Sequence, residues 1–176
     1  MQNCLAVYTT KRAINGRKLV DIARSVGIDL RFLALGGQIS SNTEAILSKS
    51  LVGVNGGGLL IVGGFEEDQE NLIDFDIRLN QGDQPALARK LNGGLLPWCE
   101  LYSHKFNYEK ACLQDQTEQA KLDGSVTQKQ LPLLKAAKYR YLIYNQSRKK
   151  KGSQLMKVLT PALAEAVDGI VADYQR

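Results

Sequence analysis

The richest concentration of chemically distinctive residues is a basic, tyrosine-containing stretch near the carboxyl end of the sequence. Its candidate nucleic-acid ligands are Lys135, Lys138, Arg140, Tyr141, Arg148, Lys149, Lys150 and Lys151. Lysine and arginine neutralise phosphates, and tyrosine rings stack on bases. The composition therefore predicts a protein that binds nucleic acid or a phosphorylated ligand. A solvated loop ahead of the last helix is the alternative interpretation.

Strand periodicity limits how these tyrosines and cations can act together. Residues 139–144 have the composition of a strand, in which successive side chains point to opposite faces of the sheet. Tyr139 and Tyr141 would then face one way, and Arg140 and Tyr144 the other. The tyrosines of this stretch are therefore not expected to share a single surface.

Two glycine-rich segments could instead build the pocket of a small-molecule enzyme. Their candidate ligand-binding residues are Gly36, Gly37, Ser40, Ser41, Asn42, Thr43, Gly56, Gly57 and Gly58. Backbone N–H groups of successive glycines and of helix N-termini bind anions. Neither segment matches a phosphate-binding loop or a dinucleotide fingerprint, because Gly58 is followed by an apolar run. Tight turns and helix caps are the alternative interpretation.

Side chains suited to catalysis or metal binding are few. His104 is the only histidine, and pairing it with Cys99 or Cys112 would require a contact that sequence spacing does not establish. Asp74 and Asp76 would share one face of a strand, as ligands of a divalent cation do, but an exposed strand edge accounts equally well for that alternation. We assign no catalytic residue, cofactor or metal site on this basis.

The elements that must position these residues indicate an α/β fold. In the amino-terminal half the pattern predicts a strand at 5–10, a helix at 17–26, a strand at 28–35, a helix capped near Ser41, and apolar runs at 51–54 and 59–62. The two runs form either a hairpin, which we favour, or a loop before one buried strand. This β-α-β-α-β order is typical of a sheet with crossover helices, so we expect a mixed sheet in two or three layers.

The rest of the sequence predicts further strands and a long amphipathic helix. The strands fall at 71–79, 95–106 and 139–144, and the helix at 154–174. Pro161 interrupts the helical pattern, so a second start capped by Thr160 is an alternative. If the apolar stripe of this helix docks on another subunit, the protein is a structural or oligomeric interaction module, and a homo-oligomer forms through the helix.

Length and composition set the class of protein. The 176 residues are 44% hydrophobic and 23% charged, which predicts a single domain over 1–176 with a core of its own. The longest apolar stretch, 57–65, is about half of what a membrane-spanning helix needs, and three cysteines at no metal-binding spacing predict buried thiols. We therefore expect a cytoplasmic protein with no membrane partner. The net charge of +5 favours an anionic ligand.

Overall fold

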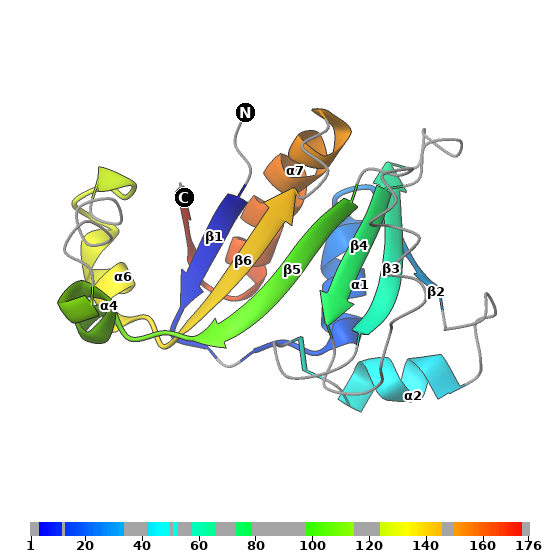
Figure 1. The fold of residues 1–176 in the computed structure, drawn as a ribbon, viewed down its shortest axis with the longest axis horizontal. Coiled ribbons are helices and arrows are strands. Elements are labelled where there is room, and N and C mark those ends of the chain that lie inside the picture. Colours follow the sequence, from blue (N-terminus) through cyan, green and yellow to red (C-terminus); the bar gives the residue numbers. More distant parts are fainter. Residues whose placement is uncertain are drawn as a thin grey trace.

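The computed structural model describes residues 4–11, 13–33, 42–49, 51–52, 58–65, 73–78, 98–114, 124–145 and 150–173. These residues form a mixed α/β protein, which confirms the predicted class (Figure 1). The strands are β1 (Cys4–Thr9), β2 (Ile28–Leu33), β3 (Gly58–Phe65), β4 (Ile73–Arg78), β5 (Trp98–Lys105), β6 (Tyr139–Asn145) and β7 (Ile170–Asp173). The helices are α1 (Gly16–Ser25), α2 (Asn42–Lys49), α4 (Tyr108–Gln114), α6 (Leu131–Ala136) and α7 (Lys150–Ala166).

The described strands make one mixed sheet. Their order is β2-β3-β4-β5-β6-β1-β7. The β4–β5 pair is parallel, and the other pairs of the described strands are antiparallel. Since β1 and β2 lie far apart in this order, α1 does not connect neighbouring parallel strands as we expected. It carries the chain across one face of the sheet instead (Figure 1).

The apolar runs at 51–54 and 59–62 do not pair as a hairpin. β3 has β2 on one side and β4 on the other, so both of its edges are already occupied. Leu51 forms a bridge with Asn15, and the N–H of Val52 donates to the carbonyl of Ile14 at 2.9 Å. The Ser103 hydroxyl donates to the carbonyl of Val52. These bonds hold the described part of the first run against the start of α1 and β5, so the hairpin prediction is wrong.

Two cores lie on opposite faces of the sheet. On the face covered by α1 and α7, the buried side chains include Leu5, Val7, Leu19, Leu101, Tyr141, Ile143, Leu155, Leu159 and Leu163. On the other face, beside α4 and α6, they include Tyr8, Phe106, Tyr108, Leu134, Leu142 and Ile170. The alternation of β6 is therefore as predicted, because Tyr141 and Ile143 enter the first core while Leu142 enters the second.

Helix α7 is shorter at its carboxyl end than the predicted helix. Thr160 is fully buried in its interior, so the helix does not begin again there. It stops at Ala166 because Asp168 takes a left-handed conformation with φ of 46°, and the N–H of Gly169 donates back to the carbonyl of Ala164 at 2.7 Å. The residues after Gly169 form β7, which pairs with β1. The helix prediction is wrong for this last segment.

The apolar stripe of α7 packs against other parts of the same chain. Leu155, Met156, Leu159 and Leu163 are almost completely buried in the first core. The exposed residues of this helix are Lys150, Gln154, Lys157, Pro161 and Glu165. Most of the stripe that suggested docking on another subunit is therefore covered within the chain, with Val158 and Ala166 half-buried. In the part of the chain that the structure describes, neither α7 nor any other helix is long and apolar enough to cross a membrane.

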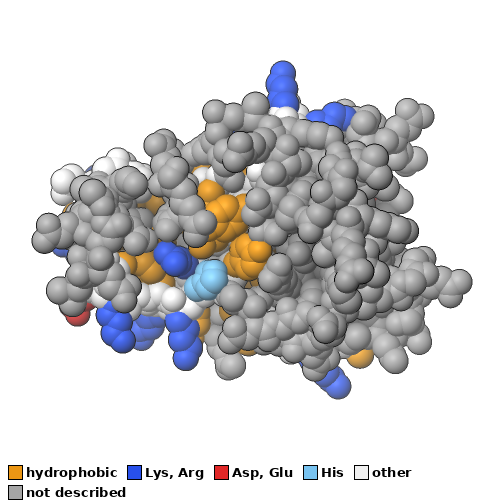
Figure 2. All heavy atoms as spheres, in the orientation of Figure 1, with side chains coloured by type: hydrophobic (Ala, Val, Ile, Leu, Met, Phe, Trp, Pro, Cys, Tyr) orange, Lys and Arg blue, Asp and Glu red, His pale blue; other side chains and the backbone are white. Residues whose placement is uncertain are grey.

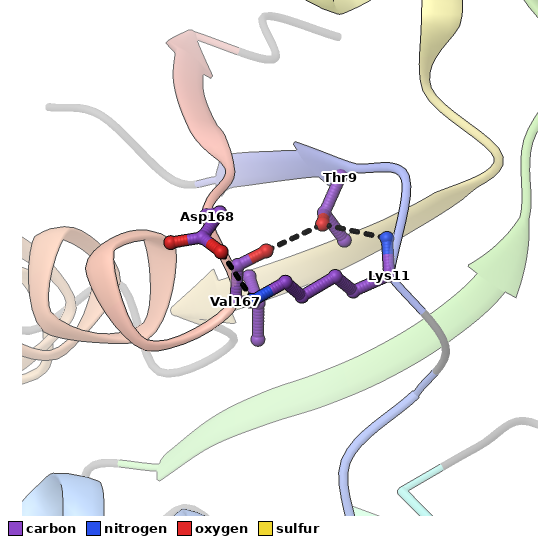
Figure 3. Close-up of polar contacts among 4 residues, drawn as sticks. All are labelled: Thr9, Lys11, Val167 and Asp168. Atoms are coloured by element: carbon purple, nitrogen blue, oxygen red, sulfur yellow. Dashed lines mark hydrogen bonds and ion pairs between the residues drawn. The ribbon is translucent and has the colours of Figure 1, made fainter.

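The turn between α7 and β7 is fastened to the end of β1 by Thr9 (Figure 3). The buried Thr9 hydroxyl donates to the carbonyl of Val167 at 2.6 Å and accepts from the backbone N–H of Lys11 at 3.0 Å. The Lys11 ammonium group forms an ion pair with Asp168, and both side chains are exposed. One hydroxyl thus joins the first strand to the last turn of the described chain.

We expect Thr9→Val to lower the free energy of unfolding by about 1–3 kcal/mol, because the Val167 carbonyl loses its donor while valine keeps the shape of the side chain. Urea denaturation followed by circular dichroism measures the change. Lys11→Ala is the control, and its effect should be below about 1 kcal/mol because the Lys11–Asp168 pair is exposed. Equal effects of the two substitutions would contradict the importance of the buried hydroxyl.

Candidate anion-binding pocket

A basic pocket lies where β5 ends and β6 begins. It has a volume of about 510 Å³ and is lined by Lys105, Phe106, Asn107, Lys110, Ala111, Lys138, Tyr139 and Arg140. The lining comes from two segments far apart in the sequence, the passage from β5 into α4 and the passage from α6 into β6. The pocket therefore exists only because these two segments meet at one end of the sheet.

Antiparallel pairing brings the two segments together. In the β5–β6 register Lys105 is opposite Tyr139, and His104 is opposite Arg140. Beyond the last pair, the N–H of Phe106 donates to the carbonyl of Lys138 at 2.8 Å. The N–H of Lys138 donates in turn to the carbonyl of Thr9 at 2.9 Å, which links the pocket wall to β1. Backbone hydrogen bonds thus fix the places from which the cationic side chains extend.

Phe106 is the apolar support of the pocket. Its ring is buried and meets the ring of Tyr8 edge to face, with centroids 4.8 Å apart. The guanidinium carbon of Arg140 lies 5.8 Å from the centroid of the Phe106 ring, within the range of a cation–π contact. The start of α4 follows directly, where the side chain of Asn107 accepts from the N–H of Lys110 at 2.9 Å. The Arg140 guanidinium therefore has an aromatic contact, and the backbone of Lys110 is fixed at the start of α4.

The described lining of the pocket is rich in positive charge. Four of its lining residues, Lys105, Lys110, Lys138 and Arg140, are cationic, and none of the described residues that line it is acidic. The three lysines are exposed, whereas Arg140 is half-buried. Like charges gathered around one cavity repel each other, and an anion placed among them removes that repulsion while gaining attraction from each. The arrangement suits a ligand with more than one negative charge.

An aromatic row extends from the pocket across the same face of the sheet. Tyr102 and His104 of β5 stack with ring centroids 6.1 Å apart, and Tyr102 meets Tyr144 of β6 edge to face at 5.9 Å. All three side chains are half-buried. Burial lowers the pKa of His104 below its ordinary 6.5, and the charge of Arg140 lowers this pKa further. Figure 2 shows the histidine at the surface, with hydrophobic and Lys or Arg side chains beside it.

The structure divides the predicted basic stretch between the two ends of β6. Lys138 and Arg140 line the pocket, and the exposed Lys135 lies nearby on α6 with its ammonium 5.8 Å from the centroid of the Tyr108 ring. Lys150 and Lys151 begin α7, whose first turn is joined to Asn145, at the far end of β6, through Ser153. Seven residues of strand, about 20 Å, separate these ends. Arg148 and Lys149 lie outside the described residues.

Tyr141 does not belong to this surface. It is fully buried on the face covered by α1 and α7, where its hydroxyl accepts from the backbone N–H of Ile14 at 2.9 Å. Burial raises the pKa of this phenol, while the hydrogen bond from Ile14 lowers it. A ring in this position is not available to stack on a base. Tyr102 and Tyr144 lie on the opposite face of the sheet and are half-buried.

The glycine-rich segments lie largely outside the part of the chain that the structure describes. This applies to Gly36, Gly37, Ser40, Ser41, Gly56 and Gly57. Asn42 and Thr43 begin α2, and Gly58 begins β3. Leu33, the last residue of β2, pairs with Leu60, so β2 ends and β3 begins at the same end of the sheet. A pocket built from these two segments stays a prediction.

The described residues assemble no metal-binding cluster, and Cys99 is poorly placed to act as a nucleophile. Cys99 is completely buried, which raises the pKa of its thiol to about 12, and its Sγ contacts the carbonyl of Gly152 at 3.6 Å. A thiol that remains protonated at neutral pH is a poor nucleophile. No group of three or more His, Cys, Asp or Glu side chains within the described ranges is placed to hold a metal ion.

Half of the cationic residues that line the pocket were not predicted from the sequence. Lys105 and Lys110 flank the end of a predicted strand and were given no role, because about 30 residues separate them from Lys138. Pairing the predicted strands at 95–106 and 139–144 would have indicated this region, because it places Lys105 beside Tyr139. Sequence periodicity predicts each strand but not its partner.

Comparison with known proteins finds no match to this chain among protein-family models, curated proteins or solved structures. The class that the fold and the site define is a mixed α/β protein with a basic pocket at one end of its sheet.

Proposed function

We propose that this protein binds a phosphate-bearing ligand, nucleic acid or a phosphorylated small molecule, in the pocket between β5, α4 and β6. The observation that carries the proposal is the convergence of Lys105, Lys110, Lys138 and Arg140 on one cavity, with no acidic side chain among its described lining residues. A chance excess of surface lysines would be spread over the molecule and interspersed with carboxylates. Here the cations come from two separate segments and surround a common space.

Phosphate chemistry fits the particular side chains of the pocket. Arg140 presents a planar guanidinium that can donate two parallel hydrogen bonds to phosphate oxygens, and its contact with Phe106 keeps it in place. The lysines supply point charges on flexible stems that follow a ligand of several phosphates. Lys135, on the neighbouring α6, would add to the attraction at longer range.

The test uses a double charge reversal, Lys105→Glu with Lys138→Glu, and two probes. Inorganic triphosphate is measured by isothermal titration calorimetry, and a short fluorescent single-stranded oligonucleotide by anisotropy. We expect both probes to bind the wild-type protein more weakly as salt rises, and the double variant to lose about tenfold or more in affinity, because two phosphate contacts become repulsive.

The matched control reverses Lys150 and Lys157, which are exposed on α7 at a distance from the pocket and change the net charge by the same amount. This variant should keep affinity within about threefold of wild type, since screening weakens charges beyond a Debye length. If it loses as much affinity as the pocket variant, the attraction is a property of the whole surface, and the pocket is not the site. Probe binding that does not weaken as salt rises would contradict the proposal as well.

A further inference from the structure

We infer that the phosphate-bearing ligand is a single-stranded nucleic acid whose bases stack on the aromatic row formed by Tyr102, His104 and Tyr144. The inference rests on the proposed function, because it extends the ligand from the phosphate pocket onto the adjoining sheet face. It follows from two features that lie side by side, a cluster of cations and a set of partly exposed rings.

The register of the sheet connects the two features. His104 is opposite Arg140, which lines the pocket, and the alternation of β5 and β6 puts both side chains on the face that carries Tyr102 and Tyr144. From His104 the row continues to Tyr102 on the same strand and to Tyr144 on β6. A backbone phosphate held by Arg140 therefore places the adjoining nucleotides over the rings. Small phosphorylated metabolites would occupy the pocket and leave most of this row untouched.

The rings favour bases over other apolar partners. Every base has a π-face that stacks on an aromatic side chain whatever the sequence, and Arg140 next to the row supplies the positive charge that stacked nucleotides require. The described face carries rings beside cations, with tyrosine hydroxyls and an imidazole for polar contacts. An aliphatic peptide partner would gain nothing from four cations beside its docking surface.

A single strand is the form that can use this surface. In a duplex the faces of the bases are covered by their neighbours, so only their edges are accessible in the grooves. Unpaired bases can turn out of the strand and lie flat on a sheet, a mode used by several classes of single-strand binder. Duplex binding would engage the cations alone and give no role to Tyr102 or Tyr144.

The experiment compares two strands of equal length and equal charge, oligo(dT) and the corresponding abasic strand of deoxyribose phosphates. Wild-type protein should bind oligo(dT) at least about tenfold more tightly, because only this strand has bases to stack. The variant Tyr102→Leu with Tyr144→Leu should bind both strands with the affinity that wild type shows for the abasic one. Tyr102→Phe with Tyr144→Phe keeps both rings and should retain the preference.

Two further measurements make the result decisive. His104 is the only histidine, so its ring signals in a proton–carbon NMR spectrum report on the row directly and should shift with oligo(dT) much more than with inorganic triphosphate. Near-ultraviolet circular dichroism checks that the leucine variant is folded, and if it is not, the His104 shifts of the wild type decide. Equal affinity for the two strands would overturn this inference and leave the phosphate pocket intact. Failure of both strands and of triphosphate would overturn the pocket too.

Discussion

Replacing Tyr141 with alanine is expected to lower the free energy of unfolding by about 3–5 kcal/mol, the range for truncating a large buried aromatic side chain. The ring is fully buried in the core between the sheet and helices α1 and α7. Its removal leaves a cavity that the surrounding strands cannot fill. Chemical denaturation of the purified variant measures the loss, which is a large fraction of the stability that is typical of native proteins.

Tyr141→Phe separates the hydroxyl from the ring. It leaves the N–H of Ile14 without the acceptor that lies 2.9 Å away, and the expected cost is about 1–3 kcal/mol. Because Tyr141 faces away from the pocket, this variant should bind the oligonucleotide and triphosphate with wild-type affinity. A variant with normal stability and weakened binding would contradict the position that the structure gives to this residue.

Replacing Gly169 with valine is expected to destabilise the protein by about 3 kcal/mol, at the upper end of the usual cost of overpacking. A Cβ atom at this position would lie 2.8 Å from the backbone carbonyl oxygen of Tyr8 and 2.9 Å from Cγ1 of Val7. A backbone oxygen inside a sheet cannot move aside as the end of a side chain can. β7 must therefore shift away from β1, and the contacts around Thr9 and Val167 are lost with it.

The matched control is Gly124→Val. A Cβ atom at Gly124 would meet no atom of the described residues within 4 Å, and the φ of this residue is not in the left-handed range. We expect a change below about 0.5 kcal/mol for this exposed site. Hydrogen exchange adds a local test, because Gly169→Val should expose the amides of β7 and the paired part of β1 first. Similar stability of the two valine variants would show that β1 and β7 are not packed as closely as described.

The site illustrates which parts of a surface can be found without a structure. Lys138 and Arg140 were found because they lie in one short stretch of unusual composition. The same stretch also drew in Tyr141 and Lys150, which the fold places on another face and at another end. Composition describes residues that are neighbours in the sequence, whereas a pocket requires residues that lie close together in the folded chain. The alternation of side chains along β6 already predicted part of this difference, because it placed Tyr141 and Arg140 on opposite faces of the sheet.

The C-terminal helix shows the same limit in two other ways. The apolar stripe of α7 was correctly seen as one face of a helix, but only packing shows that this face meets β1 and α1 within the chain. The apolar residues 170–172 continue the helical stripe as well as they fit a strand. They form β7 because the free edge of β1 accepts them after the turn at Asp168.

By itself, the sequence determined the α/β class and the position of most strands and helices, and it predicted an anionic ligand. These follow from periodicity, capping residues and charge, which act between residues close together in the chain. The tertiary structure decided the strand order, the pairing of β5 with β6, and thereby the basic pocket with its aromatic row. The pairing of the strands depends on burying the apolar side chains of both sheet faces at the same time. The free energy that favours one pairing therefore comes from residues throughout the chain.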